Sequence, residues 1–199
     1  MNLYTRLAIS ALLILAVTSC TINGGPRLIK LGVMPEDRVC RLAVLPFVNE
    51  TDFELGGLIF YRIFMSELVS SGKYVVSQEG DIRKIYRQLN ITPKKMPTFE
   101  QVRILANRLD VQLFVTGRVV DMAEIVSGQE SRPSLAVDIR IIQADPARIL
   151  WTTYHRSEGE QYRKVMHYGM ENTVTGLAKR ASGEILKLWF SEGFNKCME

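Results

Sequence analysis

The sequence predicts an α/β protein, a single three-layer-like domain in which helices cover a mixed parallel and antiparallel sheet. Short apolar runs alternate with helical periodicity in the first half, three β-rich runs follow one another in the second, and a helical stretch closes the chain. Strands joined through a helix pair in parallel, whereas short connections favour antiparallel pairing. The expected order is β-α-β-α-α-β-β-β-α.

The first strand is predicted over 40–48, where the near-continuous apolar run is typical of a strand buried on both faces. Pro46 cannot donate a ladder hydrogen bond, so pairing should weaken there. A polar turn at 49–52 precedes a helix over 55–69, which Gly72 ends.

A short strand at 74–76 and two helices, over 79–89 and 98–109, are expected next. Thr98, followed three residues later by Gln101, indicates a capping box at the start of the later helix.

The second half predicts an antiparallel meander. Strands are expected over 111–120, 135–142 and 149–155, the second with the alternation of a half-buried strand. A polar loop at 121–134 and a turn at 144–148 should connect them. A mostly helical segment follows over 160–190, in which Gly169 is a candidate position for a break.

The first twenty residues have the order of a secretory signal. Arg6 provides the positive charge, 7–17 is an uncharged apolar run, and Thr18 and Ser19 are small. As a helix the apolar run rises about 16 Å, against a hydrocarbon core of about 30 Å. A permanent transmembrane helix is therefore not expected.

Cys20 follows at once, and residues 17–20 resemble the lipobox of bacterial lipoproteins. The resemblance implies cleavage between Ser19 and Cys20, a diacylglycerol on the sulfur and an acyl chain, such as palmitate, on the amine. Two or more chains anchor stably, whereas one binds reversibly. Thr21 in place of Asp implies the periplasmic face of the outer membrane, by resemblance to enterobacterial sorting. The alternative is an ordinary signal peptide that is followed by a cysteine only by chance.

We therefore divide the chain into a signal peptide (1–19), a lipid anchor with a flexible tether (20–38), one α/β domain (39–192) and a tail (193–199). Apolar residues make up 47% of the sequence, enough for a core, and the net charge is +4. The charges are interspersed, which does not indicate a nucleic-acid partner.

Cys40 and Cys197 lie near the two ends of the folded region. In an oxidising compartment they could form a disulfide. The alternative is two unpaired thiols, and we favour it because spacing along the sequence does not fix the Cα separation.

No catalytic, metal or cofactor motif is evident. Neither His155 nor His167 has partners at metal-ligand spacing, so each is expected to be an ordinary side chain. Gly56-Gly57 lacks the further residues of a phosphate loop.

The remaining charged clusters have simple interpretations. The carboxylate pairs Glu79/Asp81 and Asp121/Glu124 are typical of charged turns. The basic residues Arg83, Lys84 and Arg87 should form the solvated face of a helix.

Polar surface loops are the candidate partner-binding sites, because recognition often resides in loops held on a rigid scaffold. The alternative is that they only connect elements. The candidate residues are Asp52, Phe53 and Glu54, then Lys94 and Lys95, then Gln129, Glu130 and Arg132.

Segments 41–49 (RLAVLPFVN), 109–117 (LDVQLFVTG), 137–145 and 149–153 resemble the curli-secretion lipoprotein family CsgG and its relatives LpoB and the amino-terminal domain of TolB. The resemblance implies a periplasmic α/β domain. Pore-forming members carry two long membrane-crossing hairpins, for which 121–134 and 144–148 are too short and too polar.

These observations predict a noncatalytic lipoprotein whose domain binds another envelope protein, or itself, in envelope assembly or regulation. Two alternatives are a ring-forming collar of a secretion or surface-organelle apparatus and an enzyme acting on envelope polymers, for which no site is recognisable.

Overall fold

The computed structural model describes residues 24–35, 39–128, 130–164, 168–194 and 197. The signal peptide, Cys20, Gln129 and His167 lie outside this part of the chain. None of the helices within it is both long enough and apolar enough to span a bilayer.

A seven-stranded mixed sheet forms the centre of the domain, in the order β1-β7-β6-β5-β2-β4, with β3 paired to β5. β2, β3 and β4 run parallel to their neighbours, whereas β5, β6 and β7 form an antiparallel meander that β1 extends. This confirms the predicted fold class. The strands are β1 (Arg27–Lys30), β2 (Arg41–Val44), β3 (Val48–Asn49), β4 (Val75–Val76), β5 (Leu113–Ser127), β6 (Glu130–Gln143) and β7 (Arg148–Glu158).

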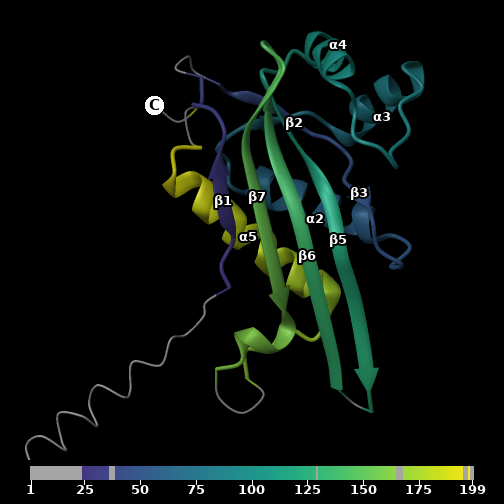
Figure 1. The fold of residues 1–199 in the computed structure, drawn as a ribbon, viewed down its shortest axis with the longest axis vertical. Coiled ribbons are helices and arrows are strands. Elements are labelled where there is room, and N and C mark those ends of the chain that lie inside the picture. Colours follow the sequence, from purple (N-terminus) through teal and green to yellow (C-terminus); the bar gives the residue numbers. More distant parts are fainter. Residues whose placement is uncertain (1–23, 36–38, 129, 165–167, 195–196, 198–199) are drawn as a thin grey trace, which may run out of the picture.

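Helices pack on both faces of the sheet (Figure 1). α2 (Gly56–Ser70) and α5 (Val174–Ser191) cover one face, and α3 (Glu79–Gln88) and α4 (Phe99–Leu109) cover part of the other. Successive strand residues point to opposite faces. Leu42 and Val44 therefore belong to the core under α2 and α5, and Ala43 and Leu45 belong to the core under α3 and α4. The predicted capping box of Thr98 and Gln101 is confirmed.

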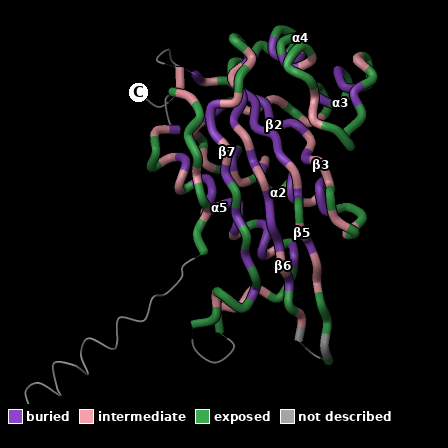
Figure 2. The backbone as a smooth tube through the Cα atoms, viewed as in Figure 1, coloured by how far each residue is buried: buried purple, intermediate pink, exposed green. Residues whose placement is uncertain are grey.

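The larger core, between the sheet and α2/α5, is built around aromatic side chains. Phe47 contacts Phe60 edge-on with ring centroids 5.3 Å apart, and Phe64 contacts Trp189 in the same way at 5.7 Å. Trp189 donates its indole N–H to the hydroxyl of Thr153 at 2.8 Å, which satisfies the polar atom of a fully buried ring. Figure 2 shows the buried residues concentrated in the upper part of the sheet.

The prediction of a tether through residue 38 is wrong for 27–30. These residues form β1, which pairs antiparallel with β7, so that Arg27 lies opposite Tyr154 and Lys30 opposite Trp151. Leu28 packs against the larger core. The sequence signal was weak because a four-residue edge strand beside Gly and Pro has little periodicity.

One further prediction is wrong. Residues 121–134 are not a loop but the far end of the β5–β6 hairpin, which stays paired down to Ser127 opposite Glu130. The helical segment expected over 160–190 consists of a short 3-10 turn, η1 (Gly159–Tyr162), and α5, and residues 168–173, around the expected break at Gly169, are not helical. Cross-strand pairing outweighed the polar composition of 121–134.

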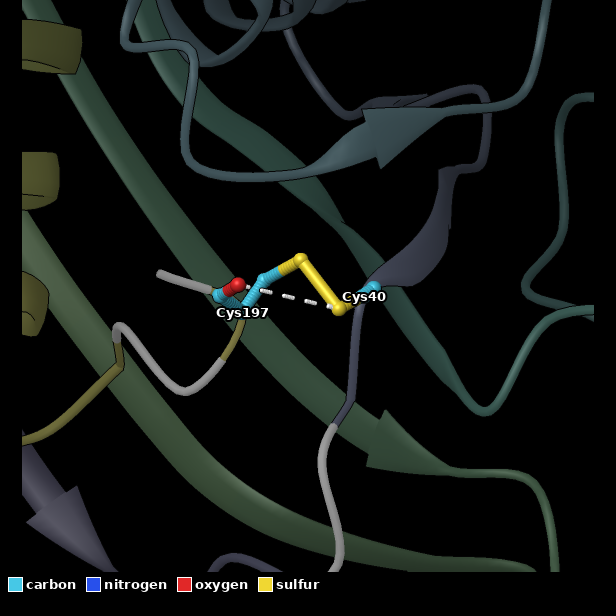
Figure 3. Close-up of a disulfide and its surroundings, with 2 residues drawn as sticks. All are labelled: Cys40 and Cys197. Atoms are coloured by element: carbon cyan, nitrogen blue, oxygen red, sulfur yellow. Dashed lines mark hydrogen bonds between the residues drawn. A yellow bond between two sulfur atoms is a disulfide. The ribbon is translucent and has the colours of Figure 1, made fainter. Parts of the chain in front are cut away.

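Cys40 and Cys197 form a disulfide with their Cα atoms 4.6 Å apart (Figure 3), so the favoured alternative of two free thiols is wrong. The tail is also less loose than expected, because Phe194 is buried among Tyr74, Trp151 and Trp189. The bridge therefore joins the start of β2 to a segment that already packs on the core.

We predict that replacing both Cys40 and Cys197 by serine lowers the free energy of unfolding. The bridge closes a loop of 157 residues, which corresponds to about 5 kcal/mol in the chain-entropy model. Thermal or urea unfolding, with and without reductant, measures the loss. Reductant should destabilise the wild type and leave the double variant unchanged. Equal stability of the two oxidised proteins would contradict the structural role of the bridge.

Candidate partner-binding surface

The second face of the sheet is only partly covered. Near β2 it carries the apolar side chains under α3 and α4, but further along β5, β6 and β7 its residues become polar. No helix within the described residues packs on this lower part, where Tyr154 and Ile29 are 46% and 51% exposed. We call this region the uncovered sheet face. Its main side chains are Ile29, Arg118, Asp138, Arg140, Thr152, Tyr154 and Arg156.

Asp138 is the centre of a hydrogen-bonded network on this face. Its Oδ2 accepts from Arg118 Nε at 3.1 Å and from Arg140 Nη2 at 3.0 Å, and its Oδ1 accepts from the Thr152 hydroxyl at 3.0 Å. Arg118 also donates to Glu50 at 3.2 Å. The network crosses three strands and fixes the arginines over an otherwise flat surface.

Burial acts to raise the pKa of Asp138, but the charge of Arg140 and the hydrogen bonds from Arg118 and Thr152 outweigh it and hold the pKa below its usual value. The hydrogen bonds that Arg118 donates, to Asp138 first and then to Glu50, raise the pKa of Arg118. Asp138 and Arg118 are therefore both charged at neutral pH, which suits electrostatic recognition of a protein.

The predicted loop at Asp52–Glu54 lies beside this face and is held rigidly. Asn49 donates to the carbonyl of Phe53 at 2.8 Å and accepts from the Thr51 hydroxyl at 2.8 Å. Asp52 and Glu54 are exposed, whereas Phe53 packs against the larger core.

Gly57 explains the glycine pair that follows this loop. A Cβ at Gly57 would lie 2.6 Å from the carbonyl oxygen of Phe47. The glycine therefore lets α2 start directly against the backbone of Phe47, between β2 and β3, a structural role unrelated to phosphate binding.

The second predicted loop also borders this face, next to Arg140. Lys94 and Lys95 are exposed, and the next residue, Met96, places its sulfur 3.8 Å from Arg140 Nη1. Two candidate loops distant in sequence are thus brought to one surface.

The third candidate loop is not part of it. Arg132 lies near the tip of the β5–β6 hairpin and pairs with Glu160 at 3.1 Å, Glu130 belongs to β6, and Gln129 lies outside the described residues. The hairpin extends beyond the helices (Figure 1), so its tip is separate from the uncovered sheet face.

His155 lies on the opposite face, buried against α5 with 1% of its surface exposed. Its Nε2 is 2.8 Å from Glu184 Oε2, to which Tyr162 also donates at 3.1 Å. Burial lowers the pKa of His155, against the raising effect of Glu184, and burial raises the pKa of Tyr162 to about 12. The imidazole therefore lies in the contact between β7 and α5, and its Nδ1 has no hydrogen-bond partner among the described residues.

The carboxylate pairs have structural partners. Glu79 pairs with Arg62 at 3.0 Å, and Asp121 pairs with Arg156 at 3.4 Å. Glu124 accepts from the Ser131 hydroxyl at 2.9 Å and from the Val174 N–H at 3.4 Å. Over the described residues, no group of three or more His, Cys, Asp or Glu is placed to hold a metal ion.

Sequence reasoning missed the main residues of this surface: Arg118, Asp138, Arg140 and Tyr154. The available signal was the alternation in 135–142, where Asp138 and Arg140 occupy the face opposite Ile139 and Ile141. That pattern shows which side is polar but not which strands lie beside it.

No protein-family model matches the chain, and no curated protein matches it. Solved structures do. The PelC dodecamer from Paraburkholderia phytofirmans superposes with a TM-score of 0.55 at 14% identity, covering 81% of this chain and 94% of that one. Lipoprotein GNA1162 from Neisseria meningitidis gives 0.53 at 12% identity, covering 76% and 99%.

The chain therefore has the α/β fold seen in these two proteins, one of which is a lipoprotein. The carboxy-terminal domain of LpoB from Salmonella enterica is less similar, with a TM-score of 0.47 at 15% identity, covering 64% of this chain and 87% of that one. The resemblance to CsgG stays a prediction.

We predict that Asp138→Asn lowers the free energy of unfolding by about 1–3 kcal/mol at pH 7, because two arginines lose their charged acceptor. The pKa of Asp138 is lowered in the folded state, so its contribution is complete above the carboxyl's unfolded pKa, about 3.9, and is lost as the pH falls through the folded value. Urea unfolding from pH 7 to pH 3 measures the difference.

The destabilisation should be constant between about pH 7 and pH 5 and should shrink below about pH 4. Asp52→Asn, at an exposed loop position, should change stability by less than about 0.5 kcal/mol. A difference between Asp138→Asn and wild type that grows on acidification would contradict the charged network.

Proposed function

We propose that this chain is a noncatalytic bacterial lipoprotein, anchored through Cys20 to the periplasmic face of the outer membrane, whose domain binds protein in envelope assembly or regulation. The observation that carries the proposal is the uncovered sheet face, a charged surface fixed by the Asp138 network and bordered by the Asp52–Glu54 and Lys94–Lys95 loops. Its exposed tyrosine and ordered arginines are the residue types that dominate protein interfaces.

Two further observations support an exported protein. The disulfide between Cys40 and Cys197 is of a kind that persists in oxidising compartments and is rare in the cytosol. The fold is also that of a neisserial lipoprotein. Both agree with the signal sequence and the lipobox of residues 17–20.

A ring-forming collar is the second candidate. It is favoured by the similarity to PelC, which is a dodecamer in its solved structure. In that case the partner of the uncovered sheet face is a further copy of this chain, and a head-to-tail contact repeated around an axis would close a ring.

We predict that a photo-crosslinking amino acid at Tyr154 forms an adduct in living cells, because this ring is exposed in the middle of the proposed interface. The same amino acid at Lys187, exposed on the outer side of α5, is the matched control. Denaturing gels and mass spectrometry measure the adducts.

An adduct with another envelope protein from Tyr154 and none from Lys187 supports the binding domain. An adduct of twice the chain mass supports the collar. Cross-linking from Lys187 alone, or from neither position, would contradict the assignment of this face.

A further inference from the structure

The lower end of the molecule carries exposed apolar side chains that the proposed protein interface does not use. Ile125 and Val126, near the end of β5, are 66% and 68% exposed. α5 begins level with Glu124, whose carboxylate accepts from the Val174 N–H. Beyond that level the hairpin projects past the helices (Figure 1).

η1 lies at the same end (Figure 1). η1 packs on the hairpin through the ion pair of Arg132 with Glu160 and through the close approach of Gly159 to Pro133. Just beyond it Tyr168 is 80% exposed, and Lys164 donates its backbone N–H to the Tyr168 carbonyl at 2.9 Å. We call Ile125, Val126, Arg163, Lys164 and Tyr168 the hairpin end.

The charge of the hairpin end is positive. Of the acids near it in the chain, Glu158 pairs with Arg156, Glu160 with Arg132 and Glu171 with Arg180. Glu124 instead accepts hydrogen bonds from the Ser131 hydroxyl and the Val174 N–H. Arg163 and Lys164 are exposed and form no ion pair with any described residue. Exposed aliphatic side chains, an exposed aromatic ring and free cations at one end of a molecule are the composition of a surface that lies at a bilayer interface.

The register of the sheet shows that the chain leads back toward this end. Arg27 lies opposite Tyr154, and the preceding residues continue in the direction of Glu158, which is the direction of the hairpin tip. Cys20 is seven residues before Arg27, so the peptide between them reaches at most about 25 Å.

The hairpin extends by nearly the same length. Tyr154 lies opposite Asp138, and β6 begins eight residues earlier, at Glu130, which places the tip about 26 Å beyond the level of Arg27. The peptide from Arg27 to Cys20 is therefore no longer than the distance from the level of Arg27 to the hairpin tip. A bilayer that holds a lipid on Cys20 must lie within reach of that tip.

We propose that the hairpin end rests on the membrane, with Ile125, Val126 and Tyr168 in the headgroup region and Arg163 and Lys164 against anionic lipid. This inference rests on the proposed anchor at Cys20. It orients the domain with its sheet upright on the bilayer, so that the uncovered sheet face points sideways and stays open to a partner.

The test uses the full lipidated protein in vesicles of phosphatidylethanolamine and phosphatidylglycerol. An environment-sensitive fluorophore is attached to Val126→Cys with the native disulfide left oxidised, and Val75→Cys is the matched control. Val75 is 60% exposed and lies on β4, at the opposite end of the sheet from Ser127. We expect the emission of the Val126 probe to shift to the blue and to be quenched several-fold more than the Val75 probe by a nitroxide on the lipid.

Each failure has its own signature. Protein that does not float with the vesicles would contradict the proposed lipid anchor at Cys20, and with it the inference that depends on that anchor. Protein that floats while both probes stay in water overturns the inference alone. A blue shift of equal size without vesicles means that the hairpin end contacts a second copy, which also overturns it.

A charge reversal gives an independent readout. Arg163→Glu with Lys164→Glu should reduce the quenching of the Val126 probe several-fold, since each basic residue near an anionic surface contributes about fivefold to binding. Lys84→Glu with Arg87→Glu, two exposed residues of α3 that form no ion pair with any described residue, should leave it unchanged. Equal effects of the two pairs would contradict a local contact of the hairpin end with lipid.

Discussion

The antiparallel pairing of β5 with β6 is the interaction on which the rest of the structure depends. It runs from Leu113 opposite Gln143 to Ser127 opposite Glu130. Because side chains alternate along it, one register assigns every residue of both strands to a face. Near Leu113 both faces are apolar and are covered by helices. Further along, one face carries Arg118 and Asp138, and the far end projects beyond α5.

Three environments along one hairpin correspond to three roles. The upper part joins both cores, the middle presents a charged network that no described helix covers, and the tip exposes two aliphatic side chains. A one-residue slip of β6 would place Asp138 and Arg140 in the larger core, where unpaired charges are costly. The burial of Ile139 and Ile141 therefore fixes the register, and the register positions the arginines.

The sequence predicted the architecture well where periodicity was strong. The helices α2, α3 and α4 and the strands β2, β5, β6 and β7 were expected close to where they lie, because their burial follows local patterns. β1 was not predicted because a strand of four residues is too short to show a hydrophobic period. Residues 121–134 were predicted as a loop because β pairing depends on the partner strand, which a local pattern does not show. The disulfide depended on a Cα separation that sequence spacing does not contain.

The candidate site was predictable only in part. Two of the three polar loops border one surface, but the network that joins them comes from three strands and needed the sheet order to be known. Lys94 and Asp52 were found because turns are recognisable in a sequence. Arg118 was not, because a single arginine in a β run does not indicate its neighbours.

The short peptide between Cys20 and β1 would keep the domain close to the membrane if Cys20 is acylated. Detecting that acylation is the most direct test of the proposed membrane location. The measurement is mass spectrometry of the amino-terminal peptide from protein extracted from outer membranes. We predict a peptide that begins at Cys20 and carries a diacylglycerol and an amide-linked acyl chain. An unmodified peptide that begins elsewhere, or a chain that retains its first nineteen residues, would contradict the proposal that a lipid holds this domain at the membrane.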